Sequence, residues 1–316
     1  MQDSLHIPVA LERCIELLSP SIAGVESPVV IDATLGMGGH TRALLIRYPH
    51  LKVIAFDRDL GAIAIARENL RDFADRVVII HAVYDEMKSE LAELGIESVD
   101  GILFDLGVSS MQLDTAERGF AYSQEAPLDM RMDQSSGKSA YEILYSYSRS
   151  DLIHVIRSYG EEKFAPRIVD NIIAARESGR LKTTKDLADI VKESIPAPAR
   201  RTGGNPAKRT FQALRIEVNQ ELEVLERAIP QALAALKVGG RIVVMADQSL
   251  EDKIVKKAFA QVTASGTPLG LPVDLPNSAA KFNFVLRGSE GASEIEIEAN
   301  SRAGSMRLRC VERAAA

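Results

Sequence analysis

A glycine-rich turn near the N-terminus contains the residue types that let a backbone approach a nucleotide-like ligand. The turn runs from Gly36 to Thr41 and follows an apolar run that ends in an acid. Glycine permits the tight turn, and amide groups at the start of the next helix bind anions. Asp57 comes 21 residues after Gly36, at the end of the next apolar run. An acid there is placed to bind ribose hydroxyls, so the spacing predicts an adenosine-containing cofactor.

The same turn distinguishes between two classes of cofactor. A nicotinamide dinucleotide site requires a third glycine three residues after the second, and Thr41 occupies that position. The sequence therefore favours S-adenosylmethionine, with S-adenosylhomocysteine as its product. Two alternatives stay open at this point: a nucleotide-dependent oxidoreductase, and a structural turn that binds no ligand.

A second candidate site begins where a later apolar run ends at Asp105. Strand ends face the ligand crevice in open α/β sheets, so we expect Asp105 to lie where substrate and cofactor meet. Methyl transfer to an exocyclic amine requires a group that orients the amine and accepts a hydrogen bond from it. Familiar amino-methyltransferases use two prolines and an aromatic residue after this position, whereas this chain has Leu-Gly-Val. We therefore expect backbone carbonyls of residues 106–108, or the hydroxyls of Ser109 and Ser110, to accept it.

The loops that follow have an unusual composition for simple connections. Residues 118–122 and 127–133 combine charged, aromatic and methionine side chains. They are expected to form the wall of a pocket, with Phe120 or Tyr122 stacking on a base. Methylation of a pyrimidine at C5 would need a cysteine nucleophile, and neither Cys14 nor Cys310 lies near these motifs. We therefore expect direct displacement without a covalent cysteine intermediate; an amine as the nucleophile is what the family resemblance given below implies.

These candidate residues require a parallel sheet to bring them together. Apolar runs at 28–34, 52–59, 76–82 and 99–105 predict strands that are buried on both faces. They alternate with helical patterns, which indicates a doubly wound α/β fold. A fifth strand is predicted at 241–246. The segments 281–286 and 306–311 are expected to close the sheet as an antiparallel pair.

Helical patterns replace the strands in the middle of the chain. Helices are predicted at about 151–159 and 162–178, and a third follows the capping box Thr183-x-x-Asp186 and ends at Pro196. A long helix then starts at Asn205-Pro206 and is expected to kink or restart at Pro230. The predicted organisation is an α/β domain in two parts, residues 1–110 and 205–316, with a helical insertion at 111–204.

The charge of the chain is unevenly distributed. The net charge is −6, which by itself argues weakly against a nucleic-acid partner. Residues 107–215 nevertheless carry 17 Lys and Arg against 14 Asp and Glu, whereas the remainder carries 21 against 30. A basic cluster without any acid is compatible with a surface that binds a nucleic-acid backbone, with a solvated loop as the alternative; RNA as that nucleic acid is what the family resemblance given below implies. The cluster consists of Arg200, Arg201, Lys208, Arg209 and Arg215.

Composition limits the remaining classes of function. Hydrophobic residues make up 46% of the chain and no run is long enough to span a bilayer, so we expect a soluble protein without a membrane partner. The first residues lack the pattern of a signal peptide. The two cysteines lie at opposite ends without a ligand cluster, so no metal is expected. A cytoplasmic location follows from these expectations.

Eight motifs follow one another from near the N-terminus almost to the C-terminus: HIPVALERCIELL, DATLGMGGHT, FDLGVSSMQLD, RGFAY, PLDMRMD, NPAKRTFQALRIEVNQEL, SLEDKIVK and SRAGSMRLR. In this order they resemble the RsmH (formerly MraW) family of bacterial small-subunit ribosomal RNA methyltransferases. The resemblance implies a Rossmann-like, class I S-adenosylmethionine-dependent methyltransferase fold interrupted by an all-helical domain that recognises the substrate. It also implies methylation of the N4 amine of a cytosine in 16S rRNA, cytosine 1402 in the decoding region of the small subunit.

The resemblance assigns roles to individual residues. Tyr84 stands where the family commonly has phenylalanine against the adenine. Three departures concern substrate contacts: Asn205 replaces a usual histidine, residues 246–248 replace Ser-Phe-His, and residues 266–291 match no motif. The residues that match cofactor contacts are Gly38, Gly39, His40, Asp57, Tyr84, Asp105 and Gln112.

Two further alternatives share the methyltransferase fold. A non-catalytic RNA-binding factor for ribosome assembly would keep the fold without turnover, although the intact glycine turn with Asp57 and Asp105 argues against it. A small-molecule methyltransferase would act on free nucleosides.

Overall fold

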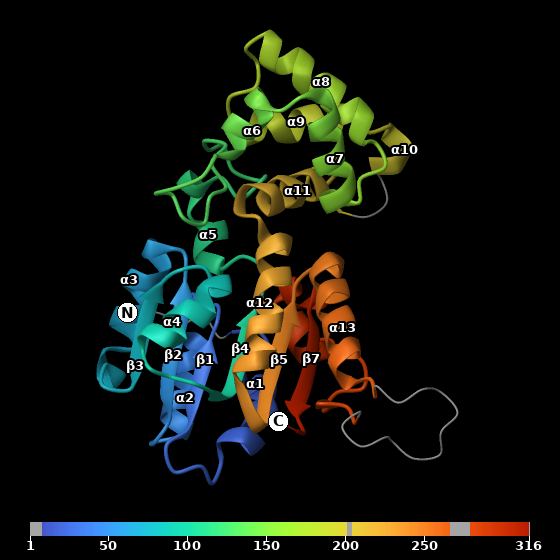
Figure 1. The fold of residues 1–316 in the computed structure, drawn as a ribbon. Coiled ribbons are helices and arrows are strands. Elements are labelled where there is room, and N and C mark those ends of the chain that lie inside the picture. Colours follow the sequence, from blue (N-terminus) through green and yellow to red (C-terminus); the bar gives the residue numbers. More distant parts are fainter. Residues whose placement is uncertain (1–7, 201–203, 266–278, 316) are drawn as a thin grey trace. The chain divides into compact units, whose positions relative to one another are not determined.

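The computed structural model describes residues 8–200, 204–265 and 279–315, and the chain forms two compact units (Figure 1). The sheet unit consists of the residues up to Gly107 and those from Leu222 onward. The helical unit consists of Val108–Glu221. Each unit has a hydrophobic core of its own.

The sheet unit is built on a seven-stranded sheet with the order β3-β2-β1-β4-β5-β7-β6. The first five strands are parallel, β7 runs antiparallel to β5, and β6 pairs antiparallel with β7. The predicted Rossmann-like α/β class and the predicted closing antiparallel pair are therefore confirmed. The strands are β1 (Val29–Asp32), β2 (Lys52–Asp57), β3 (Val77–His81), β4 (Val99–Asp105), β5 (Leu236–Ala246), β6 (Phe282–Phe284) and β7 (Arg307–Arg313).

Helices cover both faces of this sheet. Successive residues of a strand point to opposite faces, so neighbouring residues pack against different helices. Ile31 packs with α4, α12 and α13, whereas its neighbour Val30 packs with α1, α2 and α3. Strands β1, β2 and β4 are mainly apolar and buried on both faces, which explains their continuous apolar runs. The prediction was wrong for β3, which lies at the edge of the sheet and is only partly buried, with Val78 46% exposed. The helices are α1 (Leu11–Ile22), α2 (Gly39–Arg47), α3 (Leu60–Asn69), α4 (Met87–Glu93), α12 (Glu221–Ala235), α13 (Ser249–Thr263) and α14 (Glu294–Ala299).

The helical unit contains α5 to α11 around one apolar cluster. The ends of three of these helices lie within three residues of the predicted ends, and Thr183 caps α9 through the Asp186 amide as its capping box predicted. The helices are α5 (Ser110–Asp114), α6 (Ala140–Ser146), α7 (Arg149–Gly160), α8 (Ala165–Glu177), α9 (Thr184–Ser194), α10 (Ala197–Arg200) and α11 (Lys208–Asn219).

The end of the insertion differs from the prediction. Residues 205–221 belong to the helical unit, whereas we placed the boundary at 204. Phe211 and Leu214 on α11 are buried in the helical core, and Gly160 on α7 lies close to the backbone of Arg209. The sequence shows that α11 has an apolar face but does not show which core receives that face.

The helix does not restart at Pro230, which was one of the two predicted outcomes. Helix α12 continues through Pro230, and the chain breaks earlier, at Gln220, whose φ of 50° ends α11. A proline removes one hydrogen bond from a helix interior. Packing compensates here, because Ala228, Ile229 and Ala232 are buried in the sheet core.

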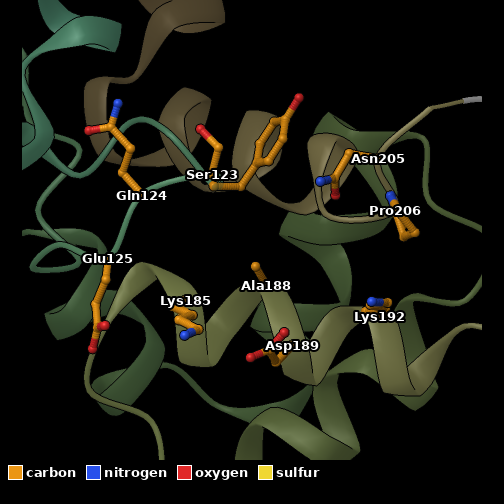
Figure 2. Close-up of a pocket in the computed structure, with 10 residues that line it drawn as sticks. Ser123, Gln124, Glu125, Lys185, Ala188, Asp189, Lys192, Asn205 and Pro206 are labelled. Atoms are coloured by element: carbon orange, nitrogen blue, oxygen red, sulfur yellow. The ribbon is translucent and has the colours of Figure 1, made fainter.

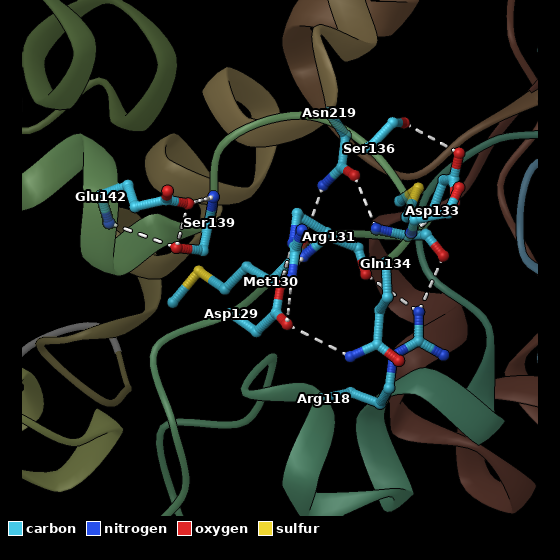
Figure 3. A network of polar contacts seen from close by, with 12 residues as sticks. Arg118, Asp129, Met130, Arg131, Asp133, Gln134, Ser136, Ser139, Glu142 and Asn219 are labelled. Atoms are coloured by element: carbon cyan, nitrogen blue, oxygen red, sulfur yellow. Dashed lines mark hydrogen bonds and ion pairs between the residues drawn. The ribbon is translucent and has the colours of Figure 1, made fainter.

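A polar network fixes the loop between α5 and α6 within the helical unit. The side chain of Asn219 accepts a hydrogen bond from the Met132 amide and donates to the Met130 carbonyl, both at 2.8 Å (Figure 3). The Arg118 guanidinium donates to the carbonyls of Arg131 at 2.9 Å and Met132 at 2.8 Å. The loop that was expected to wall a pocket is therefore held by specific contacts.

Of the unmatched stretch 266–291, residues 266–278 lie outside the described residues. The rest contains β6 and a bridge between Glu290 and Leu308 at the edge of the sheet. In the part of the chain that the structure describes, no helix has the length and apolar character needed to cross a membrane.

Candidate active site

Four aspartates gather at one edge of the sheet. Asp32 ends β1, Asp57 ends β2, Asp105 ends β4, and Asp247 directly follows β5. Because these strands are parallel and adjacent in the order β2-β1-β4-β5, their carboxyl ends lie along the same edge. Asp57 and Asp105 therefore lie at the same edge, together with Asp32 and Asp247.

The glycine turn forms the start of α2. Gly38 has a φ of 83°, which favours glycine, and it occupies the N-cap position without any side-chain cap. A Cβ atom on Gly39 would lie 2.4 Å from the Pro8 ring, so only glycine fits there. The amide groups at the start of α2 therefore keep the capacity to bind an anion.

Asp57 is fixed against the turn by two backbone amides. Its Oδ2 accepts a hydrogen bond from the Gly36 amide at 2.7 Å, and its Oδ1 accepts one from the Asp59 amide at 2.8 Å. Burial raises the pKa of Asp57 to about 6, against the lowering effect of these hydrogen bonds. Each carboxylate oxygen has a second lone pair, so Asp57 is able to accept hydrogen bonds from ribose hydroxyls.

The carboxyl group of Asp32 holds the glycine turn through hydrogen bonds, a role that was not predicted from the sequence. Its Oδ2 accepts a hydrogen bond from the Thr41 hydroxyl at 2.6 Å, and its Oδ1 accepts one from the Thr34 amide at 3.2 Å. The Thr34 hydroxyl in turn accepts one from the Asp105 amide at 2.6 Å. Burial raises the pKa of Asp32 to about 6. The signal in the sequence is an acid ending an apolar strand, with threonine in the turn.

Asp105 and His40 lie close together at this edge, and burial shifts the pKa of each side chain. The pKa of Asp105 is raised to about 7 by desolvation and then by the negative charges of Asp32 and Asp247. The side chain of Asp105 keeps 40% of its surface exposed, so solvent moderates the shift but does not change its upward direction. Burial lowers the pKa of His40 to about 4, so its ring is neutral at pH 7.

Tyr84 provides an aromatic surface after β3. Its ring lies edge-on to Phe104 of β4, with 5.4 Å between the ring centroids. The residue is half-buried. Its predicted contact with an adenine therefore stays a prediction.

Ser109, Ser110 and Gln112 belong to the helical unit, at the start of α5. The Ser109 hydroxyl accepts a hydrogen bond from the Gln112 amide at 3.2 Å, and the Gln112 side chain accepts one from the Ser109 amide at 3.1 Å. This is a capping box, which the spacing Ser-x-x-Gln also indicates. The pair therefore has a structural role in starting α5.

The basic cluster divides into exposed and buried members. Lys208 and Arg209 are exposed at the start of α11, and Arg200 is half-buried at the end of α10. Arg215 is buried instead, and its guanidinium binds both carboxylate oxygens of Glu221 at 2.8 and 3.0 Å. The structure thus gives Arg215 an internal role in place of the predicted RNA contact. Arg201 lies outside the described residues.

The residues at the sheet edge fit an adenosine-containing sulfonium compound. The turn offers amides, Asp57 offers acceptors, and the surrounding carboxylates favour a positive charge. The Nε2 atom of His40 is buried and has no hydrogen-bond partner among the described residues. Over the same residues, no group of three or more His, Cys, Asp or Glu side chains is arranged to hold a metal ion.

A family model described as the MraW methylase family matches residues 3–314. The chain belongs to this family. Its members are S-adenosylmethionine-dependent methyltransferases, so the family and the cofactor class predicted from the sequence are confirmed. Membership also excludes the nicotinamide-dependent oxidoreductase.

Close relatives carry a more specific name. A protein of Mycolicibacterium smegmatis named ribosomal RNA small subunit methyltransferase H is 55% identical over 316 residues, covering 98% of this chain and 84% of the relative. A protein of Renibacterium salmoninarum with the same name is 53% identical over 312 residues, covering 98% and 94%. A solved rRNA methylase from Streptococcus thermophilus aligns over 97% of this chain and 98% of its own at 12% identity, with a TM-score of 0.44.

Proposed function

We propose that the protein transfers a methyl group from S-adenosylmethionine to the N4 amine of a cytosine in the 16S rRNA of the small ribosomal subunit. Small-subunit rRNA as the substrate is supported by the names of relatives that are 53–55% identical. The N4 position and cytosine 1402 rest on the motif resemblance described above. The observation that carries the chemistry is the carboxyl group of Asp105 at the end of β4, with a pKa near 7.

The cytosine amine is a poor nucleophile, because its lone pair is delocalised into the ring. An acceptor that orients the amine and takes a hydrogen bond as charge develops lowers the barrier. Asp105 has this capacity, because a carboxyl group with a pKa near the working pH is suited to accept a proton. Neutral His40, with its Nδ1 atom 3.8 Å away, does not neutralise that carboxylate.

The glycine turn and Asp57 are the residues that would hold the cofactor. When bound, S-adenosylmethionine supplies an electrophilic methyl group on a sulfonium. The amides at the start of α2 suit its carboxylate, and Asp57 suits its ribose. Tyr84 and Gln112 keep their proposed cofactor contacts from the resemblance. Asp105 takes the acceptor role more readily than Ser109, whose hydroxyl caps α5.

The helical unit is proposed to bind the RNA. A cytosine in folded RNA must be unstacked before its amine becomes accessible. Arg200, Lys208 and Arg209 are the described members of the basic cluster with accessible charge, and they suit RNA phosphates. Arg201 stays in this proposal on sequence grounds alone.

Labelling tests the proposal directly. The purified protein is incubated with tritiated S-adenosylmethionine and small subunits that lack this modification, and the labelled nucleoside is identified after digestion. We expect label in N4-methylcytidine only. Label in another nucleoside would contradict the proposed target, and methylation of free cytidine in a parallel reaction without subunits would indicate a small-molecule methyltransferase. No label together with tight RNA binding would favour the assembly factor.

A further inference from the structure

A polar cavity of about 470 Å³ lies entirely within the helical unit. Figure 2 shows the loop of Ser123, Gln124 and Glu125 on one side of it and a face of α9 on the other. Asn205 and Pro206 lie at one end. Helix α9 contributes residues at spacings of three and four, which places them on one face. These residues are Lys185, Ala188, Asp189 and Lys192.

Tyr122 gives the cavity an aromatic wall. Its ring is held edge-on by Phe211, with 5.8 Å between the centroids. Phe120, the other aromatic residue predicted to stack on a base, is buried in the helical core and does not line the cavity. Tyr122 is therefore the residue of this pair that lines the cavity.

The polar lining matches the edge of a nucleobase better than a bare phosphate. Two lysines are balanced by Glu125 and Asp189, so the formal charge of the lining is zero. A site for phosphate alone would be positive, whereas a base needs both donors and acceptors. Gln124 and Asn205 supply both, and a lysine at each end of the α9 face suits the flanking phosphates.

The cavity is formed by a fixed frame. The Thr184 hydroxyl donates to the Gln124 carbonyl at 2.5 Å, and it accepts a hydrogen bond from the Ala126 amide at 2.9 Å. Asn205 accepts a hydrogen bond from the Ala207 amide at 2.9 Å, which leaves its amino group able to donate. The loop and the start of α11 are thus both held in place before any ligand binds.

We propose that this cavity binds one unpaired nucleotide of the substrate RNA, distinct from the methylated cytosine. The base stacks on Tyr122, the amide side chains read its edge, and the lysines bind the adjacent phosphates. The volume lies within the usual range for sites of small molecules, about 300–1,000 Å³. The inference rests on the proposed function for the identity of the RNA. The lining includes none of the four aspartates at the sheet edge, where the methylated base reacts.

An abasic scan tests this proposal. A fluorescein-labelled RNA hairpin copied from the decoding region is prepared with each unpaired nucleotide near the target replaced in turn by an abasic linker. Fluorescence anisotropy gives the affinity of wild-type protein and of Tyr122→Leu for each RNA. We expect one abasic position to weaken wild-type binding about tenfold, the typical effect of losing one stacked base. The same position should have no further effect in Tyr122→Leu.

Controls separate the pocket from folding and from general charge. Tyr122→Phe keeps the ring and should bind like wild type, and Lys163→Ala changes an exposed lysine outside the cavity. Lys192→Ala should weaken binding more than Lys163→Ala does. Thermal melting and S-adenosylhomocysteine binding confirm that each variant is folded. The proposal is overturned if every abasic position weakens Tyr122→Leu as much as wild type.

The two proposals fail in different ways. Methylation of subunits by wild-type protein, without any coupling between Tyr122 and an abasic position, would support the proposed function and overturn the nucleotide pocket. Coupling without methylation of any RNA would support the pocket and contradict the proposed function.

Discussion

The Nδ1 atom of His40 lies 3.8 Å from the Oδ2 atom of Asp105, although His40 follows β1 and Asp105 ends β4. They meet because β1 and β4 are adjacent and parallel, so the helix after β1 begins beside the end of β4. Burial keeps His40 neutral, and it therefore leaves the charge of Asp105 uncompensated when that group ionises. An uncompensated carboxylate at this edge favours a cationic sulfonium over the neutral thioether of the product.

Replacing Asp105 by asparagine should remove the proton acceptor while keeping the shape of the side chain. We expect Asp105→Asn to lower the methyl-transfer rate on small subunits by about 100-fold or more, the usual size of a lost general base. In wild type the rate should rise with pH as a group with a pKa near 7 ionises. Asp75→Asn, an exposed substitution in the same unit, is the control. An unchanged rate in Asp105→Asn would remove it from the site.

Asp105 should also make stability depend on pH. Its pKa is higher in the folded chain than the value of about 3.9 in an unfolded one. The folded state therefore holds a proton that the unfolded state has released, and this stabilisation is lost as pH rises from about 4 through 7. His40 acts in the opposite direction, because its folded pKa is lowered. We therefore compare the free energy of unfolding of Asp105→Asn with that of wild type, using urea at each pH. The difference should change in favour of Asp105→Asn as pH rises from about 4 to about 7.5.

Substitution of Thr41 tests whether its hydrogen bond to Asp32 stabilises the glycine turn. Its hydroxyl donates to Asp32 at 2.6 Å, and both side chains are fully buried. Thr41→Val should lower the free energy of unfolding by about 1–3 kcal/mol, because a buried carboxyl oxygen loses its partner. It should also weaken binding of S-adenosylhomocysteine in calorimetry. Thr41→Ser keeps the hydroxyl and should retain most of both, and equal losses in the two variants would contradict the role of the hydrogen bond.

Because Arg215 and Glu221 form an ion pair, we expect substitutions of these two residues to have non-additive effects on stability. Both side chains are mostly buried, with 11% and 8% of their surfaces exposed. Arg215→Met alone leaves a buried carboxylate and should cost about 3–5 kcal/mol of stability. Arg215→Met combined with Glu221→Met should recover most of that loss. Urea unfolding of the two single variants and the double variant measures the coupling, and simple additivity would contradict it.

The exposed basic residues should control the salt dependence of RNA binding. Arg200 and Arg209 each use one N–H group internally, on the carbonyls of Ile195 and Glu161, and keep others for phosphates. Replacing Arg200, Lys208 and Arg209 by alanine should reduce the slope of log K against log salt by about 0.7 for each lost phosphate contact. The double variant at Arg215 and Glu221 should leave that slope unchanged. The same slope in wild type and the triple variant would assign the cluster a structural role.

The sequence by itself determined the sheet and part of its site. Apolar runs of strand length, separated by helical patterns, admit few arrangements other than a parallel sheet. In such a sheet the residues that end the strands must share one edge. Asp57 and Asp105 were therefore predictable as neighbours of the glycine turn. The spacing Thr183-x-x-Asp186 predicted the capping box of α9 in the same local way.

Only the tertiary structure decided what each polar group faces. Arg215 lies in a basic stretch of sequence, but α11 turns it toward Glu221 and away from solvent. Asp32 and His40 acquire shifted pKa values because packing excludes water from them. The cavity beside Tyr122 depends on segments that lie far apart in the chain. The local sequence pattern determines whether apolar residues repeat with the period of a helix or of a strand. Which face of that helix or strand is buried depends on the packing of the whole core.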